Sequence, residues 1–169
     1  MSTWWLAIDR NYTSYDELKY RKVVAQGWPG IGDLKTLCAL VPANEKDAFL
    51  TAVAALSRVN GDAENPAGRV MWDLFKIRSG DLVVGIEGVN VKGVCELTKN
   101  GWESYRYDSP EAYNYAQTIG FPVEWIDWDP VFGPPPVAPA HGVQGVAGLQ
   151  AESHRVAEAW AAYQAKPQS

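Results

Sequence analysis

A tryptophan in a glycine-rich loop is the first candidate for chemistry in this chain. The segment AQGWPGIGDL, from Ala25 to Leu34, places Trp28 beside Pro29, Gly30 and Gly32. Proline fixes one backbone angle and glycine permits unusual ones, so the segment is predicted to be a loop. An indole on a loop often forms a recognition surface. The alternative is that Trp28 is a lid tucked onto the core, because large aromatic side chains are mostly buried.

Residues for covalent or acid–base catalysis are scarce. The chain has two histidines, and His141 and His154 fall in a predicted linker and a predicted tail, where neither is held beside a nucleophile. Cys38 and Cys95 lack zinc-site spacing and are interpreted as core thiols of a protein in a reducing compartment. No Walker loop or dinucleotide fingerprint is present. The sequence therefore predicts a protein that is not an enzyme and holds no metal or cofactor.

A metal-dependent nuclease is the enzymatic alternative that remains. Asp81, Glu87 and Lys92 lie on one predicted hairpin, and two carboxylates with a lysine can hold a magnesium ion. Glu87 and Lys92 lack the alternating spacing of a shared face, so a solvated hairpin is the simpler interpretation. Asp127 and Asp129 are likewise interpreted as a strand-end cap and a turn residue rather than as a carboxylate pair.

Charge and composition limit the possible partners. The 169 residues are 47% hydrophobic and carry a net charge of −5, enough for the core of one domain plus a tail. Proteins that track the phosphate backbone non-specifically are usually strongly basic, so a nucleic-acid role here needs a local basic patch and an affinity term other than charge. The start MSTWWLAIDR does not resemble a signal peptide, and no apolar run is long enough to span a bilayer. A cytoplasmic protein without a membrane partner is expected.

Capping signals and apolar periodicity predict three helices in the first half of the chain. Ser14 precedes Glu17 at capping-box spacing, ahead of a helix over Tyr15 to Lys22. A second helix is predicted over Glu45 to Val59, and Asn65-Pro66 marks the start of a third. The expected apolar faces of the last two helices are Phe49, Leu50, Val53, Ala54 and Leu56, and Met71, Trp72 and Phe75.

Short runs rich in Val, Ile and aromatic residues predict strands. They cover Thr3 to Ile8, Asp81 to Glu87, Val91 to Thr98, Gly101 to Tyr107 and Phe121 to Asp127. Asn100-Gly101 predicts a hairpin turn, and Ser109-Pro110 predicts a short helix through about Gln117. The tryptophans assigned to the core are Trp4, Trp5, Trp72 and Trp125.

The C-terminal part is predicted to be a Pro/Gly-rich linker and a helix. The helix, Gln150 to Ala165, has Val156, Trp160 and Tyr163 on one face and either docks on the domain or binds a partner. The expected organisation is a domain over 1–132, a linker over 133–149 and a helical tail over 150–169. The expected fold class is α+β, with a curved, antiparallel-rich sheet or barrel flanked by helices.

Four segments in order carry a family resemblance. WWLAI, YDELKYRKVVAQGWPGIGDL, IRSGDLVVGIEGVNVKGVCEL and FPVEWIDW resemble the EVE-type domain of the PUA-like superfamily, which is related to the YTH-type readers of 6-methyladenine. The resemblance covers roughly Thr3 to Trp128. Such domains hold a modified base, flipped out of its nucleic acid, in an aromatic pocket, and several are fused to nuclease or ATPase modules in bacterial modification-dependent restriction systems.

The resemblance implies a non-catalytic reader of a modified base in double-stranded DNA, with 5-methylcytosine or 5-hydroxymethylcytosine favoured. The chain contains no HNH or ATPase motif, so a nuclease partner would be a separate module. By position, Trp28 matches the cage aromatic on the loop after the first helix. A second wall is expected after GVCEL, where Trp102 is slightly favoured over Tyr105 and Tyr107. The alternative for these three rings is cross-strand packing.

Polar contacts to the base and the phosphates are also implied. Asp33 either accepts a hydrogen bond from an exocyclic amine or caps a helix starting near Leu34, and Asp9 and Gln26 are further polar candidates. The candidate phosphate contacts are Arg10, Lys19, Arg21, Lys22 and Lys35. A solvated helix face is the simpler interpretation of the run Lys19-Tyr20-Arg21-Lys22.

Two further functions stay open. An RNA-binding module would use the same pocket. A protein-interaction module would instead bury Trp28 and use Trp160 of the C-terminal helix as its apolar contact.

Overall fold

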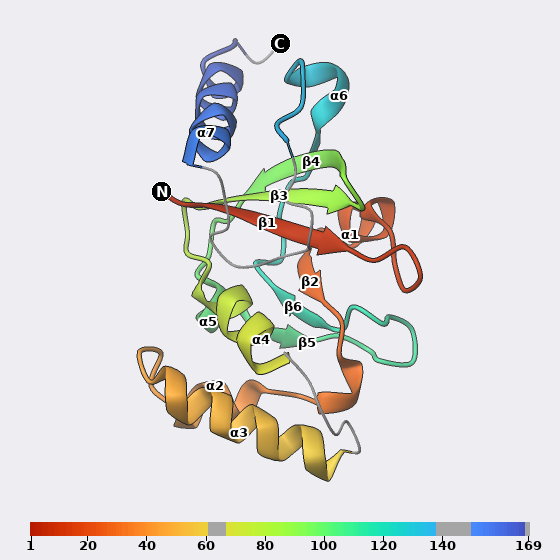
Figure 1. Ribbon diagram of the computed structural model, residues 1–169, viewed down its shortest axis with the longest axis vertical. Helices are drawn as coiled ribbons and strands as arrows, with labels where there is room; N and C mark the ends of the chain where they lie inside the picture. The colour runs from red at the N-terminus through yellow and green to blue at the C-terminus, as the bar shows by residue number, and fades with distance from the viewer. Residues whose placement is uncertain (61–66, 138–149, 168–169) are drawn as a thin grey trace.

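The fold combines two small sheets with helices on several sides (Figure 1). The structure is a computed structural model that describes residues 1–60, 67–137 and 150–167. The first sheet has the order β1-β3-β4-β7, with strands β1 (Thr3–Ile8), β3 (Leu82–Glu87), β4 (Asn90–Glu96) and β7 (Ile126–Asp127). The second has the order β2-β6-β5, with strands β2 (Val24–Gln26), β6 (Gln117–Ile119) and β5 (Arg106–Tyr107).

The first sheet separates two apolar clusters. β1 runs parallel to β3, which forms an antiparallel hairpin with β4. Because side chains alternate along a strand, Trp4 and Leu6 face the main core while Trp5 packs with Val84 and Val94 in a second core. The second core is completed by α7 (Gln150–Gln164), whose Val156 and Trp160 are buried against it. The predicted apolar face of this helix is thus confirmed, and the helix docks on its own domain (Figure 1).

The main core is built from the helices predicted in the first half. α1 (Tyr15–Arg21) begins after Ser14, whose Oγ accepts a hydrogen bond from the Glu17 N–H at 3.1 Å, as the capping box predicts. α3 (Lys46–Val59) and α4 (Ala67–Lys76) pack on each other. Of the predicted stripe on α3, Ala54 is wrong because it is exposed. Asn65-Pro66 lies outside the described residues. The four tryptophans assigned to the core are all buried.

The predicted strand from Gly101 to Tyr107 is wrong over most of its length. The segment forms α5 (Gly101–Ser104) and then only β5. The Gly101 N–H donates to the Ile77 carbonyl at 2.7 Å, and a Cβ on Gly101 would lie 2.8 Å from the Leu74 carbonyl oxygen. Asn100-Gly101 therefore starts a helical turn pressed against the end of α4, rather than a hairpin.

Two neighbouring predictions also fail. The segment from Ser109 forms turns instead of a helix, and Gln117 begins β6. The strand predicted from Phe121 is limited to β7, because the Val123 N–H donates to the carbonyl of Lys22, at the end of α1, rather than to a strand. α6 (Trp128–Val131) follows β7 directly.

The fold class is α+β, as predicted, and the sheets do not close into a barrel. Most strand pairs are antiparallel, and β1 with β3 is a parallel pair. None of the helices in the described ranges is long and apolar enough to cross a membrane. Residues 138–149 of the predicted linker, including His141, lie outside the described residues.

Candidate functional site: the Trp28 loop

Trp28 adopts a left-handed backbone conformation. Its φ is 53° and its ψ is 50°, immediately before η1 (Pro29–Ile31). A bulky residue rarely adopts this conformation, which costs on the order of 1–3 kcal/mol and persists only where surrounding contacts impose it. The side chain is half-buried and packs against the edge of the main core, so part of the indole is exposed. Trp28 is therefore neither a fully exposed recognition surface nor a fully buried lid.

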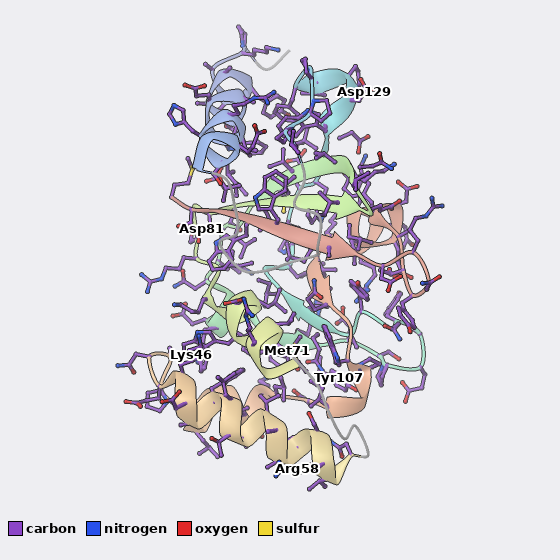
Figure 2. The ribbon with its side chains drawn as sticks, viewed as in Figure 1. Lys46, Arg58, Met71, Asp81, Tyr107 and Asp129 are labelled. Carbon is purple, nitrogen blue, oxygen red and sulfur yellow. The ribbon has the colours of Figure 1, made fainter. Side chains whose placement is uncertain are left out.

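Hydrogen bonds from the buried Gln117 and Tyr105 and from the half-buried Tyr107 hold the Trp28 loop. The amide Nε2 of Gln117, a fully buried residue, donates to the carbonyls of Trp28 at 3.3 Å and Gly32 at 3.0 Å. Tyr105 Oη donates to Gln117 Oε1 at 2.6 Å and accepts from the Leu34 N–H at 3.0 Å. Tyr107 Oη donates to the Pro29 carbonyl at 2.6 Å (Figure 2). These contacts hold the loop in its conformation.

The phenols of this set remain protonated donors at neutral pH. Burial raises the pKa of Tyr105 and Tyr107 above the ordinary value of 10.0, and the charge of Asp33 raises both pKa values further. Burial also raises the pKa of Tyr115. A protonated phenol keeps its O–H donor, so the hydrogen bonds under the loop do not depend on pH in the physiological range.

The end of β1 meets the Trp28 loop through Tyr115. Tyr115 Oη accepts from the Asp9 N–H at 3.0 Å and donates to the Ala7 carbonyl at 3.3 Å, which also accepts from Gln26 Nε2 at 3.4 Å. A Cβ on Gly27 would lie 3.2 Å from Asn114 Oδ1 and 3.6 Å from the Tyr115 ring. The turn after β1, the Trp28 loop and the β5–β6 connection therefore lie on one side of the molecule (Figure 1).

Of the three candidates for the second aromatic wall, Trp102 packs in the core. Trp102 was slightly favoured, but its ring packs among Phe49, Trp72 and Phe75, and its Nε1 donates to the Cys38 carbonyl at 3.0 Å. Its position on α5 rather than on a strand turns it into the core.

Tyr105 and Tyr107 contact the Trp28 loop, Tyr105 from the core and Tyr107 half-buried at its edge. Sequence reasoning missed Tyr12, which is 60% exposed in the turn after β1. Its place three residues after Asp9 was the available signal.

The polar candidates are divided between solvent and the interior. Asp33 is exposed, and its Oδ1 accepts from the Lys35 N–H at 2.9 Å at the start of α2 (Lys35–Leu40). This is the capping alternative. Asp9 is exposed in the turn after β1, and its Oδ1 accepts from the Asn11 N–H at 2.9 Å. Gln26 is buried and points its amide to the β1 end.

The five predicted phosphate contacts do not form one patch. Arg21 is buried, and its Nη2 donates to Asp108 Oδ2 at 3.0 Å, so the phosphate prediction for Arg21 is contradicted by its burial. Arg10 is exposed, with Nε 3.6 Å from Glu87 Oε2. Lys35 is exposed on α2, and Lys19 and Lys22 line a different surface.

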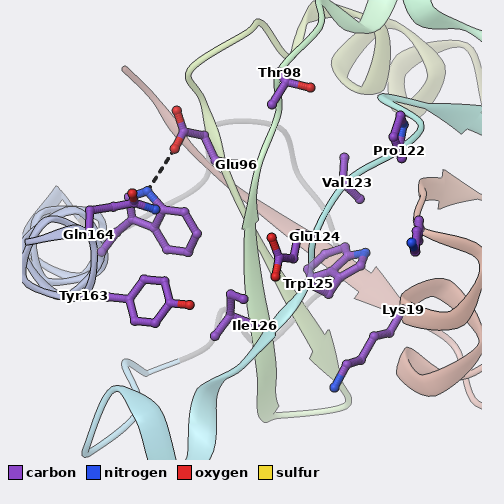
Figure 3. Close-up of a pocket in the computed structure, with 12 residues that line it drawn as sticks. Lys19, Glu96, Thr98, Pro122, Val123, Glu124, Trp125, Ile126, Tyr163 and Gln164 are labelled. Atoms are coloured by element: carbon purple, nitrogen blue, oxygen red, sulfur yellow. Dashed lines mark hydrogen bonds between the residues drawn. The ribbon is translucent and has the colours of Figure 1, made fainter. Parts of the chain in front are cut away.

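That surface is a groove of about 770 Å³ between α1, the segment after Pro122 and α7 (Figure 3). Lys19 and Lys22 line one side, while Trp160 and Tyr163 line the other. Three carboxylates lie at or near it: Glu124, Glu96, which accepts from Trp160 Nε1 at 3.0 Å, and Asp127, which is paired with Lys19. The acidic groups offset the lysines, so this groove is not a basic phosphate channel.

The carboxylates of the nuclease alternative serve separate structural contacts. Asp81, just before β3, accepts from Trp4 Nε1 at 3.0 Å and from the backbone N–H groups of Ser2 and Arg78. Glu87, at the other end of β3, accepts from the Tyr15 N–H at 2.7 Å. Figure 2 shows Asp81 far from Asp129. Within residues 1–60, 67–137 and 150–167, no three His, Cys, Asp or Glu side chains are grouped to hold a metal ion.

Comparisons with known proteins do not identify a family. No family model matches the chain, and neither the curated proteins nor the solved structures include a significant match.

The pair of Lys19 with Asp127 leads to a pH prediction. Lys19 Nζ lies 2.9 Å from both Asp127 oxygens and lowers the pKa of that carboxyl below its ordinary value of 3.8. The contact therefore stabilises the fold fully above the ordinary pKa, and its contribution is lost as the pH falls through the lowered one. When the free energy of unfolding is measured from about pH 6 to about pH 2, Lys19→Met is expected to be less stable than the unaltered protein near pH 6 and equally stable near pH 2. Lys22→Met, which removes a neighbouring exposed lysine, is expected to follow the unaltered protein throughout; a matching loss would contradict the assignment.

Proposed function

We propose that this protein is a non-catalytic nucleic-acid-binding module that reads a modified base. The base, most simply 5-methylcytosine or 5-hydroxymethylcytosine in double-stranded DNA, is flipped out and stacked on Trp28. A bacterial modification-dependent restriction system is the proposed context, with cleavage supplied by a separate nuclease partner.

The observation that carries the proposal is the left-handed, partly exposed Trp28 held by buried hydrogen bonds. Backbone strain of this kind is concentrated at functional sites. Exposed or half-exposed polar groups lie around the same loop, including Asp9 and Asn114. These groups offer acceptors for the exocyclic amine of a base.

The energetics are compatible with a protein of net charge −5. Flipping a base costs a few kcal/mol, and stacking on an aromatic face returns about 1–3 kcal/mol. One methyl group adds under about 1 kcal/mol of apolar burial, so discrimination needs a close fit and a polar contact that the wrong base leaves unpaired. Little of this affinity depends on phosphate contacts, so a basic surface is not required.

The protein-interaction alternative has less support. It relied on Trp160 as an exposed apolar contact, and Trp160 is only 8% exposed because it packs on the second core of its own chain. RNA remains an alternative ligand for the same loop.

The decisive experiment measures binding to a panel of short duplexes at two salt concentrations. The panel carries unmodified cytosine, 5-methylcytosine, 5-hydroxymethylcytosine or 6-methyladenine, with matching RNA strands alongside. One modification is expected to bind preferentially, and Trp28→Ala is expected to weaken that binding about ten- to hundredfold through lost stacking.

Trp28→Gly sharpens the test. Glycine adopts a φ of 53° readily, so this variant removes the indole while relieving the backbone strain. It is expected to lose binding as Trp28→Ala does, whereas Tyr20→Ala, which removes an aromatic ring 84% exposed on α1, is the matched control and keeps it. Equal affinity for every duplex, with the Trp28 variants unchanged, would refute the reader.

A further inference from the structure

Arg21 is the most heavily engaged charged side chain near the Trp28 loop. It is the last residue of α1, and its side chain is only 4% exposed. A buried guanidinium is expensive unless it is paired and hydrogen-bonded, so its partners indicate what it does.

Its hydrogen-bond and stacking partners lie in a single segment, the β5–β6 connection. Nη2 donates to Asp108 Oδ2 at 3.0 Å near the start of that segment and to the Tyr115 carbonyl at 2.9 Å near its end. Between them, the guanidinium carbon lies 3.9 Å from the centre of the Tyr113 ring. One side chain therefore ties both ends and the middle of residues 108–115 to α1.

The same segment borders the Trp28 loop. Tyr115 Oη binds the Asp9 N–H, and Asn114 and the Tyr115 ring lie against Gly27, the residue before Trp28. Arg21 therefore contacts the segment that borders the Trp28 loop.

Arg21 itself cannot reach a ligand. Its Nε and Nη1 are shielded from solvent and form no hydrogen bond within the part of the chain that the structure describes. Nη1 is 3.8 Å from the Glu17 carboxylate, a longer ionic contact. A phosphate would find no accessible donor on this side chain.

We propose that Arg21 is a positioning residue that clamps residues 108–115 against the Trp28 loop. In this way Arg21 sets the affinity of the Trp28 loop for the base without touching the nucleic acid. The ligand part of this inference rests on the proposed function; the clamp itself does not. Nη2 alone makes both hydrogen bonds, but lysine cannot replace arginine here, because its shorter side chain carries no planar guanidinium that stacks on Tyr113 while a nitrogen reaches both acceptors.

Arg21→Lys tests the clamp, with Arg106→Lys as the matched control. Arg106 Nε also binds Asp108, at 2.6 Å, but its side chain is 44% exposed, and no contact with Tyr113 or Tyr115 is seen in the described residues. In the ligand-free protein, Arg21→Lys is expected to accelerate amide hydrogen exchange in residues 108–117 and 27–33 relative to β3, and Arg106→Lys is not. Unchanged exchange in Arg21→Lys overturns the clamp, whether or not a nucleic acid binds.

The salt dependence of binding separates positioning from phosphate contact. With the preferred duplex, Arg21→Lys is expected to weaken binding about tenfold, within the range for residues that act on a site indirectly. Because no phosphate contact is lost, the dependence of log affinity on log salt keeps its slope; a slope smaller by about 1 would indicate a phosphate contact and overturn the proposal.

If Arg21→Lys does not fold, Tyr113→Leu removes the stacking and leaves the charges, and the same readouts apply. A wild-type protein without duplex preference refutes the reader, and the exchange result alone then decides the clamp.

Discussion

Replacing Val156 with aspartate is expected to detach α7 and to lower the free energy of unfolding by about 3 kcal/mol or more. Val156 is fully buried against the face of the first sheet that carries Trp5, Val84 and Val94. Burying its side chain contributes about 2 kcal/mol, and an unpaired carboxylate at this position would be driven into water together with the helix.

The consequence reaches beyond the helix itself. Without α7, one face of the sheet would expose a large contiguous apolar surface, which soluble proteins rarely tolerate. Val156→Asp is expected to lower the melting temperature by about 6–12 °C, to increase binding of an apolar dye and to promote aggregation. Ala161→Asp places the same charge on the exposed side of the same helix and is expected to change little. If the two variants behave alike, α7 is a dispensable tail.

The docking of α7 illustrates what the sequence could predict. The 3.6-residue spacing of Val156, Trp160 and Tyr163 marked an apolar face, just as it did for α3 and α4, because helices of this length carry their own periodic signal. The same holds for β1, where a short apolar run is buried on both sides of the sheet. The pattern did not say which surface the α7 face covers, because that choice depends on a sheet assembled from distant segments.

The elements that the sequence missed owe their structure to distant partners. β2 is three residues long and pairs Val24 with Ile119, so nothing local distinguishes it from a loop. Trp102 was misplaced because Gly101 packs against the carbonyls at the end of α4, a contact invisible in Asn100-Gly101. The sequence placed Arg21 in a solvated basic run, but its side chain is buried and paired with Asp108.

The candidate site was predictable only where its sequence signal is local. Proline and glycine around Trp28 marked the loop, since their backbone preferences are local. The residue that fixes the loop, Gln117, carried no signal, because a buried amide is recognised only by the carbonyls it reaches, and these come from Trp28 and Gly32. Burial of such a group is favourable only when every hydrogen bond is made.

Gln117→Leu is therefore expected to release the Trp28 loop while retaining the rest of the fold. The change removes the Gln117 donor from the Gly32 carbonyl and from the Trp28 carbonyl, which keeps the Ile31 N–H at 3.2 Å, and it leaves Tyr105 Oη without its acceptor, at a total cost of about 3 kcal/mol. Without those bonds, fewer contacts impose the strained φ of 53°, so Trp28 is expected to relax out of the left-handed conformation.

Gln26→Leu is the matched control, because it makes the same substitution at the residue paired with Gln117 across the β2–β6 ladder. Gln26 makes one long bond of 3.4 Å to the Ala7 carbonyl, which keeps a second donor in Tyr115 Oη. We expect Gln117→Leu, and not Gln26→Leu, to speed amide exchange across residues 27–34 and to lower the melting temperature by several degrees. If both variants exchange alike, the left-handed Trp28 is imposed by the packing of its indole on the core, and the hydrogen bonds beneath the loop follow from that packing.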